Sequence, residues 1–175
     1  MSYKKSLVLG AALISLTCFP HSEAKAFTGS ASASAVILTA VTVTGTAALH
    51  FGSITHTAAG TIAVDTANTR GAGTGGVTGI TGAGLEQSGS VLVTGASGVA
   101  IDLTITAAAT VTDGGGNNMS LNAFNLRTNA GGTQEVVTLP AAGTLAVPFG
   151  ATLNVAGTEP ANTYTGNFNI VANYQ

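Results

Sequence analysis

The chain has 175 residues, of which 45% are hydrophobic and 7% are charged, and its formal net charge is −2. This composition excludes a solvated, disordered chain, because such chains are rich in charge and poor in apolar side chains. It also excludes the basic surface that a nucleic acid would need.

The first 26 residues have the pattern of a bacterial export signal. Lys4 and Lys5 precede an apolar run from Leu7 to Phe19, and Ala24-Lys25-Ala26 has the small residues of a cleavage site. The apolar run is shorter than the roughly 20 residues that a membrane-spanning helix needs. We therefore predict a signal peptide over residues 1–26. The mature protein would start at Phe27, without stable membrane insertion, and pass through the periplasm to the cell surface or an extracellular fibre.

The predicted mature chain is long enough for one domain with a sizeable core. It has no lysine, and its two arginines against six carboxylates give a net charge of −4. We therefore expect no nucleic acid partner. Cys18, the single cysteine, leaves with the signal. No disulfide can then form, so packing and hydrogen bonds have to stabilise the fold.

The new N-terminus begins with a strand pattern that has no hairpin partner beside it. Small or apolar residues alternate with Thr28 and three serines over residues 27–37, which is the period of a half-buried strand. We predict that this segment is a donor strand, separate from a β-sandwich domain over residues 38–175. The residues on its apolar side are Phe27, Gly29, Ala31, Ala33, Ala35 and Ile37.

The rest of the chain favours short strands joined by turns. It holds most of the 24 glycines, is rich in Thr, Val and Asn, and lacks a long apolar pattern with a period of 3.6 residues. We predict an all-β fold, an antiparallel immunoglobulin-like sandwich. In chain order, the predicted strands cover residues 35–44, 47–54, 61–65, 77–80, 90–94, 99–106, 120–126, 134–139, 144–147, 151–155 and 164–174.

The last predicted strand ends one residue before the chain does. Its apolar face presents an edge that natural proteins usually cover. A spare strand at one end and an open edge at the other predict strand exchange between copies. The residues of this predicted acceptor edge are Tyr164, Gly166, Phe168, Ile170, Ala172 and Tyr174.

The sequence patterns that could indicate catalysis or cofactor binding have simpler structural explanations. The glycines of Gly71–Gly76 fit G-x-G-x-x-G, but no helix follows to face a pyrophosphate. His50, His56 and Asp65 could approach a metal, yet solvent-facing histidines explain the pattern more simply. Asp113 lies in a glycine-rich loop typical of a tight turn. We predict no enzyme activity, no cofactor and no metal site.

Five short elements carry a resemblance to a known family. The chain resembles a secreted bacterial family catalogued as domain of unknown function 4402, which is similar in layout to spore coat U and archaic chaperone-usher pilins. Those subunits are immunoglobulin-like sandwiches that lack their last strand. Unlike many pilins, this chain has no cysteine pair. The elements are Leu49-His50-Phe51-Gly52, Gly75-Gly76-Val77, Val93-Thr94-Gly95, Phe149-Gly150-Ala151-Thr152-Leu153 and Tyr164-x-Gly166-x-Phe168-x-Ile170.

The resemblance implies a homopolymer built by donor-strand exchange, with a periplasmic chaperone and an outer-membrane usher as partners. The protein would be a structural subunit of a pilus- or fimbria-like fibre that supports surface adhesion or biofilm. Phe27 and Ile37 would anchor the donor, at about 1.5–3 kcal/mol each for full burial. In the alternative, the segment folds back onto its own domain, and the protein is a self-complemented, secreted monomer with an adhesive or matrix role.

Overall fold

The computed structural model describes residues 28–82, 85–105, 108–127 and 132–175. The predicted signal peptide and Phe27 lie outside this range. Ile37–Gln175 forms one compact unit, and residues 28–36 are the described part of another. Residues 28–41 contain no strand or helix.

The compact unit consists of strands joined by turns, and no helix occurs in the described ranges. The strands are β1 (Thr42–Ala47), β2 (Ile54–His56), β3 (Gly60–Val64), β4 (Val77–Gly79), β5 (Gly89–Thr94), β6 (Ala100–Ile105), β7 (Ala109–Thr112), β8 (Asn118–Leu126), β9 (Gln134–Thr138), β10 (Thr144–Val155) and β11 (Ile170–Tyr174).

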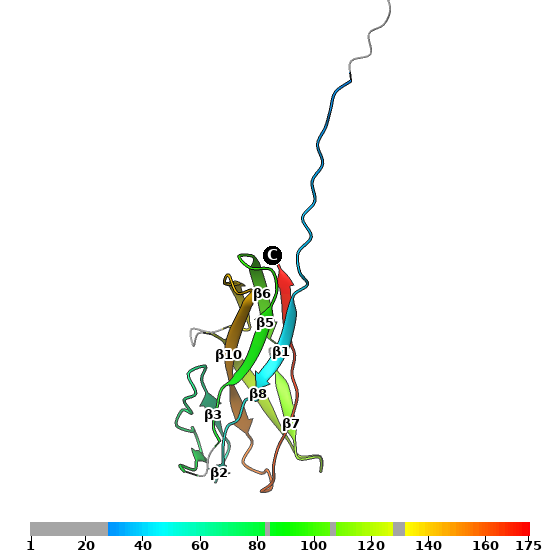
Figure 1. Ribbon diagram of the computed structural model, residues 1–175. Coiled ribbons are helices and arrows are strands. Elements are labelled where there is room, and N and C mark those ends of the chain that lie inside the picture. The colour runs from blue at the N-terminus through cyan, green and yellow to red at the C-terminus, as the bar shows by residue number, and fades with distance from the viewer. Residues whose placement is uncertain (1–27, 83–84, 106–107, 128–131) are drawn as a thin grey trace, which may run out of the picture. The chain divides into compact units, whose positions relative to one another are not determined.

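Two antiparallel sheets enclose the core (Figure 1). The larger sheet has the order β1-β5-β10-β8-β7, and β3 also pairs with β10. The smaller sheet has the order β11-β6-β9, and β2 and β4 form a separate pair. Since all the pairings are antiparallel, the prediction of an all-β antiparallel sandwich is confirmed. An immunoglobulin-like arrangement is consistent with this topology.

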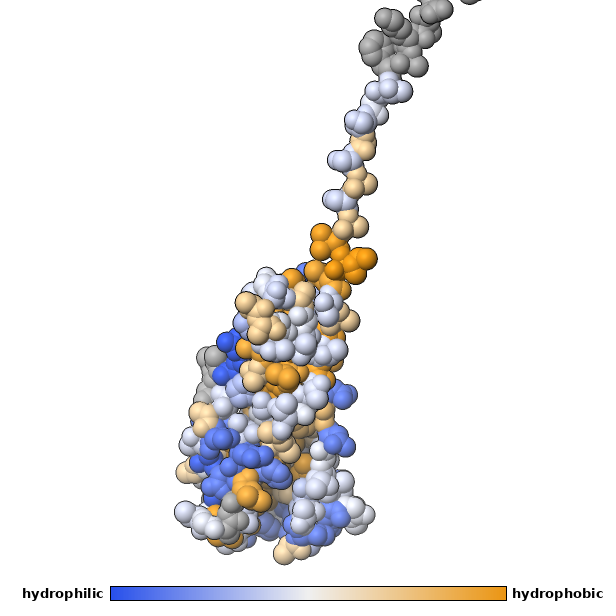
Figure 2. Space-filling model, in the orientation of Figure 1, coloured by the Kyte–Doolittle hydropathy of each residue, from blue (hydrophilic) through white to orange (hydrophobic). Residues whose placement is uncertain are grey.

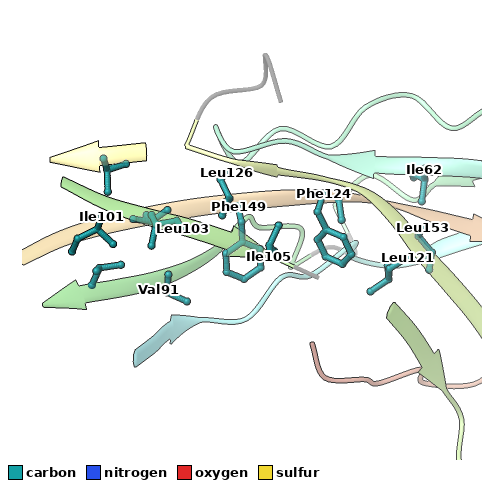
Figure 3. Packing of buried hydrophobic residues seen from close by; sticks show 14 of the residues in the cluster. Ile62, Val91, Ile101, Leu103, Ile105, Leu121, Phe124, Leu126, Phe149 and Leu153 are labelled. Atoms are coloured by element: carbon teal, nitrogen blue, oxygen red, sulfur yellow. The ribbon is translucent and has the colours of Figure 1, made fainter. Parts of the chain in front are cut away.

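Alternate residues of the central strands point inward and form the core. Along β5 and β6 every second residue is buried, and Val93, Ile101 and Leu103 are 0% exposed. Figure 3 shows Phe149 of the larger sheet beside Ile105 of the smaller one, so the two sheets share one apolar interior.

The long strand β10 changes partner halfway along its length. Its first half pairs with β5 and its second half with β3, and the change falls at Gly150. A Cβ at Gly150 would collide with the Val64 carbonyl, so only glycine allows this close approach. On the other side, Ala123 in β8 has a φ of +48° where the register shifts, which marks a β-bulge.

β1 and β11 are the outer strands on one side of the sandwich. Each lies at the end of its sheet, and Figure 1 shows β1 (cyan) next to β11 (red), running in opposite directions. Within the described ranges, no strand pairs with the second edge of either one. The two sheets therefore meet here along an open seam.

Several predicted strand boundaries are wrong. The first strand starts only at Thr42 and ends at Ala47, and residues 48–53 belong to no strand, because the chain turns at Gly52 with a φ of +70°. The last strand covers Ile170–Tyr174 alone. β7 was not predicted, and β10 is one continuous strand where two were expected.

Candidate functional site

The open seam between the sheets contains a cleft of about 350 Å³. One wall is β1 with the two residues that follow it, and the other is the segment leading into β11. The lining residues are Val43, Gly45, Ala47, Ala48, Leu49, Ser90, Val91, Phe149, Gly166, Asn167, Phe168, Asn169 and Ile170. None of these residues is charged.

Aromatic side chains form part of the floor of the cleft. Phe168 packs against Phe124 and Phe149, with ring centroids 5.0 and 5.3 Å apart. Phe149 lies opposite Gly89 in the ladder, and a Cβ at Gly89 would run into the Phe149 ring. The aromatic part of the floor is therefore apolar and closely packed.

The side chains beside the cleft are only partly covered. Val43 and Ala47 on β1, and Phe168 and Ile170 opposite, are half-buried, although all four pack against the core. The corresponding residues of the central strands are almost completely buried. This difference is expected at the outer strands of the two sheets, where no further described strand covers the side chains.

The seam that contains the cleft is closed at one end by residues beyond the cleft lining and is open at the other end. At the closed end, the Tyr174 hydroxyl donates to the Thr39 carbonyl at 2.5 Å and accepts from the Ala96 N–H at 2.6 Å. This phenol joins the last residue of β11 to the segment that leads into β1. At the open end, Ala48 and Gly166 are exposed on the two walls.

The structure brings the predicted acceptor residues together along one line. Phe168 and Ile170 line the cleft, Ala172 and Tyr174 continue the half-buried face along β11, and Gly166 is exposed in the cleft wall. Their role as an acceptor edge stays a prediction.

Tyr164 lies beyond the cleft. Its hydroxyl donates to the Pro160 carbonyl at 2.9 Å. Desolvation raises the pKa of this phenol, and the charges of Asp113 and Glu159 raise it further. Tyr164 is therefore neutral at physiological pH and supports the loop that precedes the cleft wall.

The predicted donor residues Gly29, Ala31, Ala33 and Ala35 are exposed and belong to no strand. Ile37, at the start of the compact unit, is 96% exposed. Phe27 lies outside the described residues. The donor assignment stays a prediction for all six residues.

Sequence reasoning missed the β1 wall and the cleft floor. Val41 and Val43 alternate with threonines, which predicts a strand. That pattern does not identify β1 as the strand facing the C-terminal segment across the seam. Phe149 belongs to one of the elements that carry the family resemblance, but the sequence does not place it in the cleft floor.

Two residues that were candidates for a metal site, His56 and Asp65, instead lie in hydrogen-bonding contact with loop backbone atoms. The His56 Nε2 lies 3.0 Å from the Glu159 carbonyl, and Asp65 Oδ1 accepts the N–H groups of Ala67 and Thr69. No group of three possible metal ligands occurs among residues 28–82, 85–105, 108–127 and 132–175. Across the same ranges, no helix is long and apolar enough to cross a membrane.

Two carboxylates stabilise turns. The Asn117 side chain donates to Asp113 at 2.7 Å and, with the Gly115 and Asn117 N–H groups, lowers the pKa of that carboxyl. Burial raises the pKa of Glu159, but hydrogen bonds from backbone N–H groups, including those of Ala156 and Gly157, outweigh it and leave the pKa lowered. Both carboxylates therefore accept hydrogen bonds within their own loops.

The family model described as "Domain of unknown function (DUF4402)" matches residues 41–174. The chain belongs to this family. The DUF4402 match runs from the residue before β1 to the last residue of β11, so it contains both walls of the cleft. No curated protein sequence and no solved structure matches the chain.

Proposed function

We propose that this protein is the structural subunit of an extracellular pilus- or fimbria-like fibre, in which the N-terminal segment of one copy fills the cleft of another copy. The observation that carries the proposal is the cleft between β1 and β11, with its apolar floor and two strand edges that no described strand covers. A strand inserted there would extend the backbone ladder and bury side chains of both sheets.

The donor that best fits the cleft is the chain's own segment over residues 27–37. This segment is uncharged and has alternating small residues, and the described part of it forms no strand of its own. Glycine and alanine on its inward side would let the backbone approach Phe149 and Phe168 closely. Main-chain hydrogen bonds would supply much of the affinity, and Phe27 and Ile37 would anchor the ends.

Exchange between copies is favoured over folding back within one copy. A fold-back would need a hairpin turn at Leu38-Thr39-Ala40-Val41, which contains none of the Gly, Asn, Asp or Pro residues that tight turns prefer. The Tyr174 hydroxyl also binds the Thr39 carbonyl, which keeps this segment at the closed end of its own cleft. A self-complemented adhesive or matrix monomer is therefore the less favoured function.

The closed end also gives the donor a direction. A donor is joined to its own domain by Ile37 and Leu38 alone, so it has to leave the cleft at the open end, near Ala48. It would then run antiparallel to β11, the slightly more stable pairing. Each copy would bind the next through different surfaces, and such heterologous contacts produce open filaments.

The resemblance of the sequence elements to a family similar in layout to spore coat U and archaic chaperone-usher pilins supports this proposal by analogy. It suggests a periplasmic chaperone that covers the cleft before assembly and an outer-membrane usher that exports the fibre. The signal-like N-terminus is consistent with that route. The fibre's role would be adhesion or biofilm support, without enzyme activity or a cofactor.

Deletion of residues 27–34 tests the proposal. The shortened protein should stay monomeric and show no fibres in electron micrographs, and its melting temperature should be below that of the assembled protein. A peptide of residues 27–37 should then stabilise it, by about 2.7 kcal/mol at a hundredfold excess over the dissociation constant. Fibres that persist after the deletion would overturn the proposal.

A peptide with the same composition provides a matched control. Its alanines and serines are exchanged, so that the serines fall on the inward side of the strand. It should stabilise the protein far less than the natural sequence, because the alternate side chains would no longer match the apolar floor.

A further inference from the structure

A second apolar surface lies at the end of the sandwich that carries the start of β1. Leu38 and Ile37 are 43% and 96% exposed there. Figure 2 shows hydrophobic residues (orange) gathered at this end of the domain. We call Ile37, Leu38 and the hollow beside them the end patch. The hollow is lined by Ile37, Leu38, Thr39, Gly95, Ala96, Ser97, Val99, Ala141, Ala142 and Gly143.

The end patch is unusual because its exposed apolar residues are adjacent to one another. Ile37 and Leu38 are consecutive in the chain, and both are among the exposed large hydrophobic residues of the described chain. Isolated apolar side chains on a surface are normal, but contiguous ones indicate an interaction site. The hollow is lined mostly by small residues and contains no charge, so an apolar partner could approach it closely.

We propose that the end patch docks onto the open end of the cleft in the neighbouring copy of this chain. The receiving surface is the cleft mouth, which consists of Ala48, Leu49, Gly166 and Asn167. The inference rests on the proposed donor-strand exchange. It adds a contact between the folded domains to the contact made by the exchanged strand.

The length of the connecting chain identifies the partner. Ala35, on the inward side of the predicted donor, is three residues from Leu38, a span of at most roughly 10 Å. The Tyr174 hydroxyl holds Thr39 on its own domain, so the connection cannot draw further chain from β1. A copy that holds Ala35 near its cleft mouth must therefore lie directly against the end patch.

The chemistry of the two surfaces agrees with this contact. Ala48 and Gly166 are exposed and small, Leu49 is half-buried and apolar, and no residue of the mouth is charged. The Gln87 side chain already donates to the Ala48 carbonyl at 3.0 Å, which reduces the polar surface that docking would desolvate. Both surfaces can therefore close on each other without burying an unpaired charge.

A charge-exchange experiment in the full chain tests the proposal. Leu38→Glu should raise the concentration needed for assembly by roughly tenfold or more, because the carboxylate would be desolvated without a partner. Ala48→Lys should have a similar effect. Mixed copies that each carry one of the two changes should regain assembly, because the opposite charges then meet across the contact. Leu38→Ser serves as a milder second variant.

The binding of a free peptide separates this proposal from the one on which it rests. A peptide of residues 27–37 carries both proposed anchors of the donor but not Leu38, so it should bind the cleft of the Leu38→Glu protein as tightly as that of the unchanged protein, each with residues 27–34 deleted. If the peptide binds neither, donor-strand exchange itself is wrong. If it binds both, and the full-length Leu38→Glu and Leu38→Ser chains assemble at the unchanged concentration, the end patch contact is wrong. If the mixed copies do not regain assembly, Ala48 is not the surface opposite Leu38, and the proposed contact also fails.

Discussion

Gly45→Val should stabilise the isolated domain and prevent its assembly. Gly45 lies on β1 and lines the cleft, and a Cβ placed there would have no atom within 4 Å. Its backbone does not adopt a positive φ, so a branched residue can replace it without backbone strain. The valine side chain would occupy the space that a donor strand needs.

The expected gain in stability follows from the position of Gly45 in a strand. Replacing glycine with a β-branched residue in a strand contributes about 1 kcal/mol. For a domain of this size, that free energy corresponds to a rise of roughly 2–4 °C in the melting temperature. Assembly should fall because the added methyl groups block the approach of the donor backbone to the cleft floor.

The two effects are measured on two forms of each variant. Thermal unfolding of the protein with residues 27–34 deleted gives the stability, and sedimentation of the full chain gives the assembly. Thr44→Val is the matched control, because Thr44 is exposed on the opposite face of β1. Because threonine is already β-branched, this change should alter the melting temperature little and leave assembly unchanged. Normal fibres from the Gly45→Val chain would refute the role of the cleft.

Three further changes test the packing and the loops. Gly89→Ala should cost about 1–3 kcal/mol in thermal unfolding, since its methyl group would overlap the Phe149 ring; an unchanged melting temperature would contradict the closely packed cleft floor. Phe168→Ala should cost about 2 kcal/mol, less than a fully buried phenylalanine, because the ring is half-buried; Phe168→Leu should lose less, and equal losses would exclude a role for the ring contacts. Because the pKa of Asp113 is lowered in the folded state, its contribution to stability is present above its ordinary pKa of 3.8 and disappears as the pH falls through the folded value. Asn117→Ala should therefore flatten the acid limb of a plot of melting temperature against pH, and an unchanged limb would contradict this cause.

The strand pattern of the core could be predicted from the sequence where apolar residues recur at every second position. In β6, Ile101 and Leu103 alternate with Asp102 and Thr104 and are buried as expected, and in β5 the buried Val91 and Val93 flank the partly exposed Leu92. The half-buried face from Phe168 to Tyr174 also follows the predicted alternation. Local periodicity is sufficient for these elements because each strand has one buried face.

The strand boundaries depend on contacts that the local sequence does not contain. Residues after Ala47 have a strand-like composition, but the Arg70 guanidinium donates to the carbonyls of Phe51 and Ser53 and holds them in a turn. Pro148 and Gly150 predict a break in β10. The strand continues because the Pro148 carbonyl accepts the Arg127 N–H at 2.8 Å and Gly150 fits against Val64.

The cleft could be predicted only in part. The open C-terminal edge was visible in the sequence, but its opposite wall required the sheet order, which places β1 at the end of the larger sheet. The closed end depends on the Tyr174 hydroxyl and the Thr39 carbonyl, which lie 135 residues apart in the chain. Such long-range pairings result from topology and leave no local pattern.

A disulfide cross-link between two differently tagged copies tests donor-strand exchange most directly. One copy carries a cysteine at Ala31, Ala33 or Ala35 in turn, and the other carries Ala47→Cys in the cleft wall. Residues 28–175 contain no other cysteine, and neighbouring strands bring Cβ atoms close enough for a disulfide. The account predicts a covalent dimer of the two tagged copies for at least one of the three positions. A cross-link that forms only when both cysteines are in the same chain would contradict it.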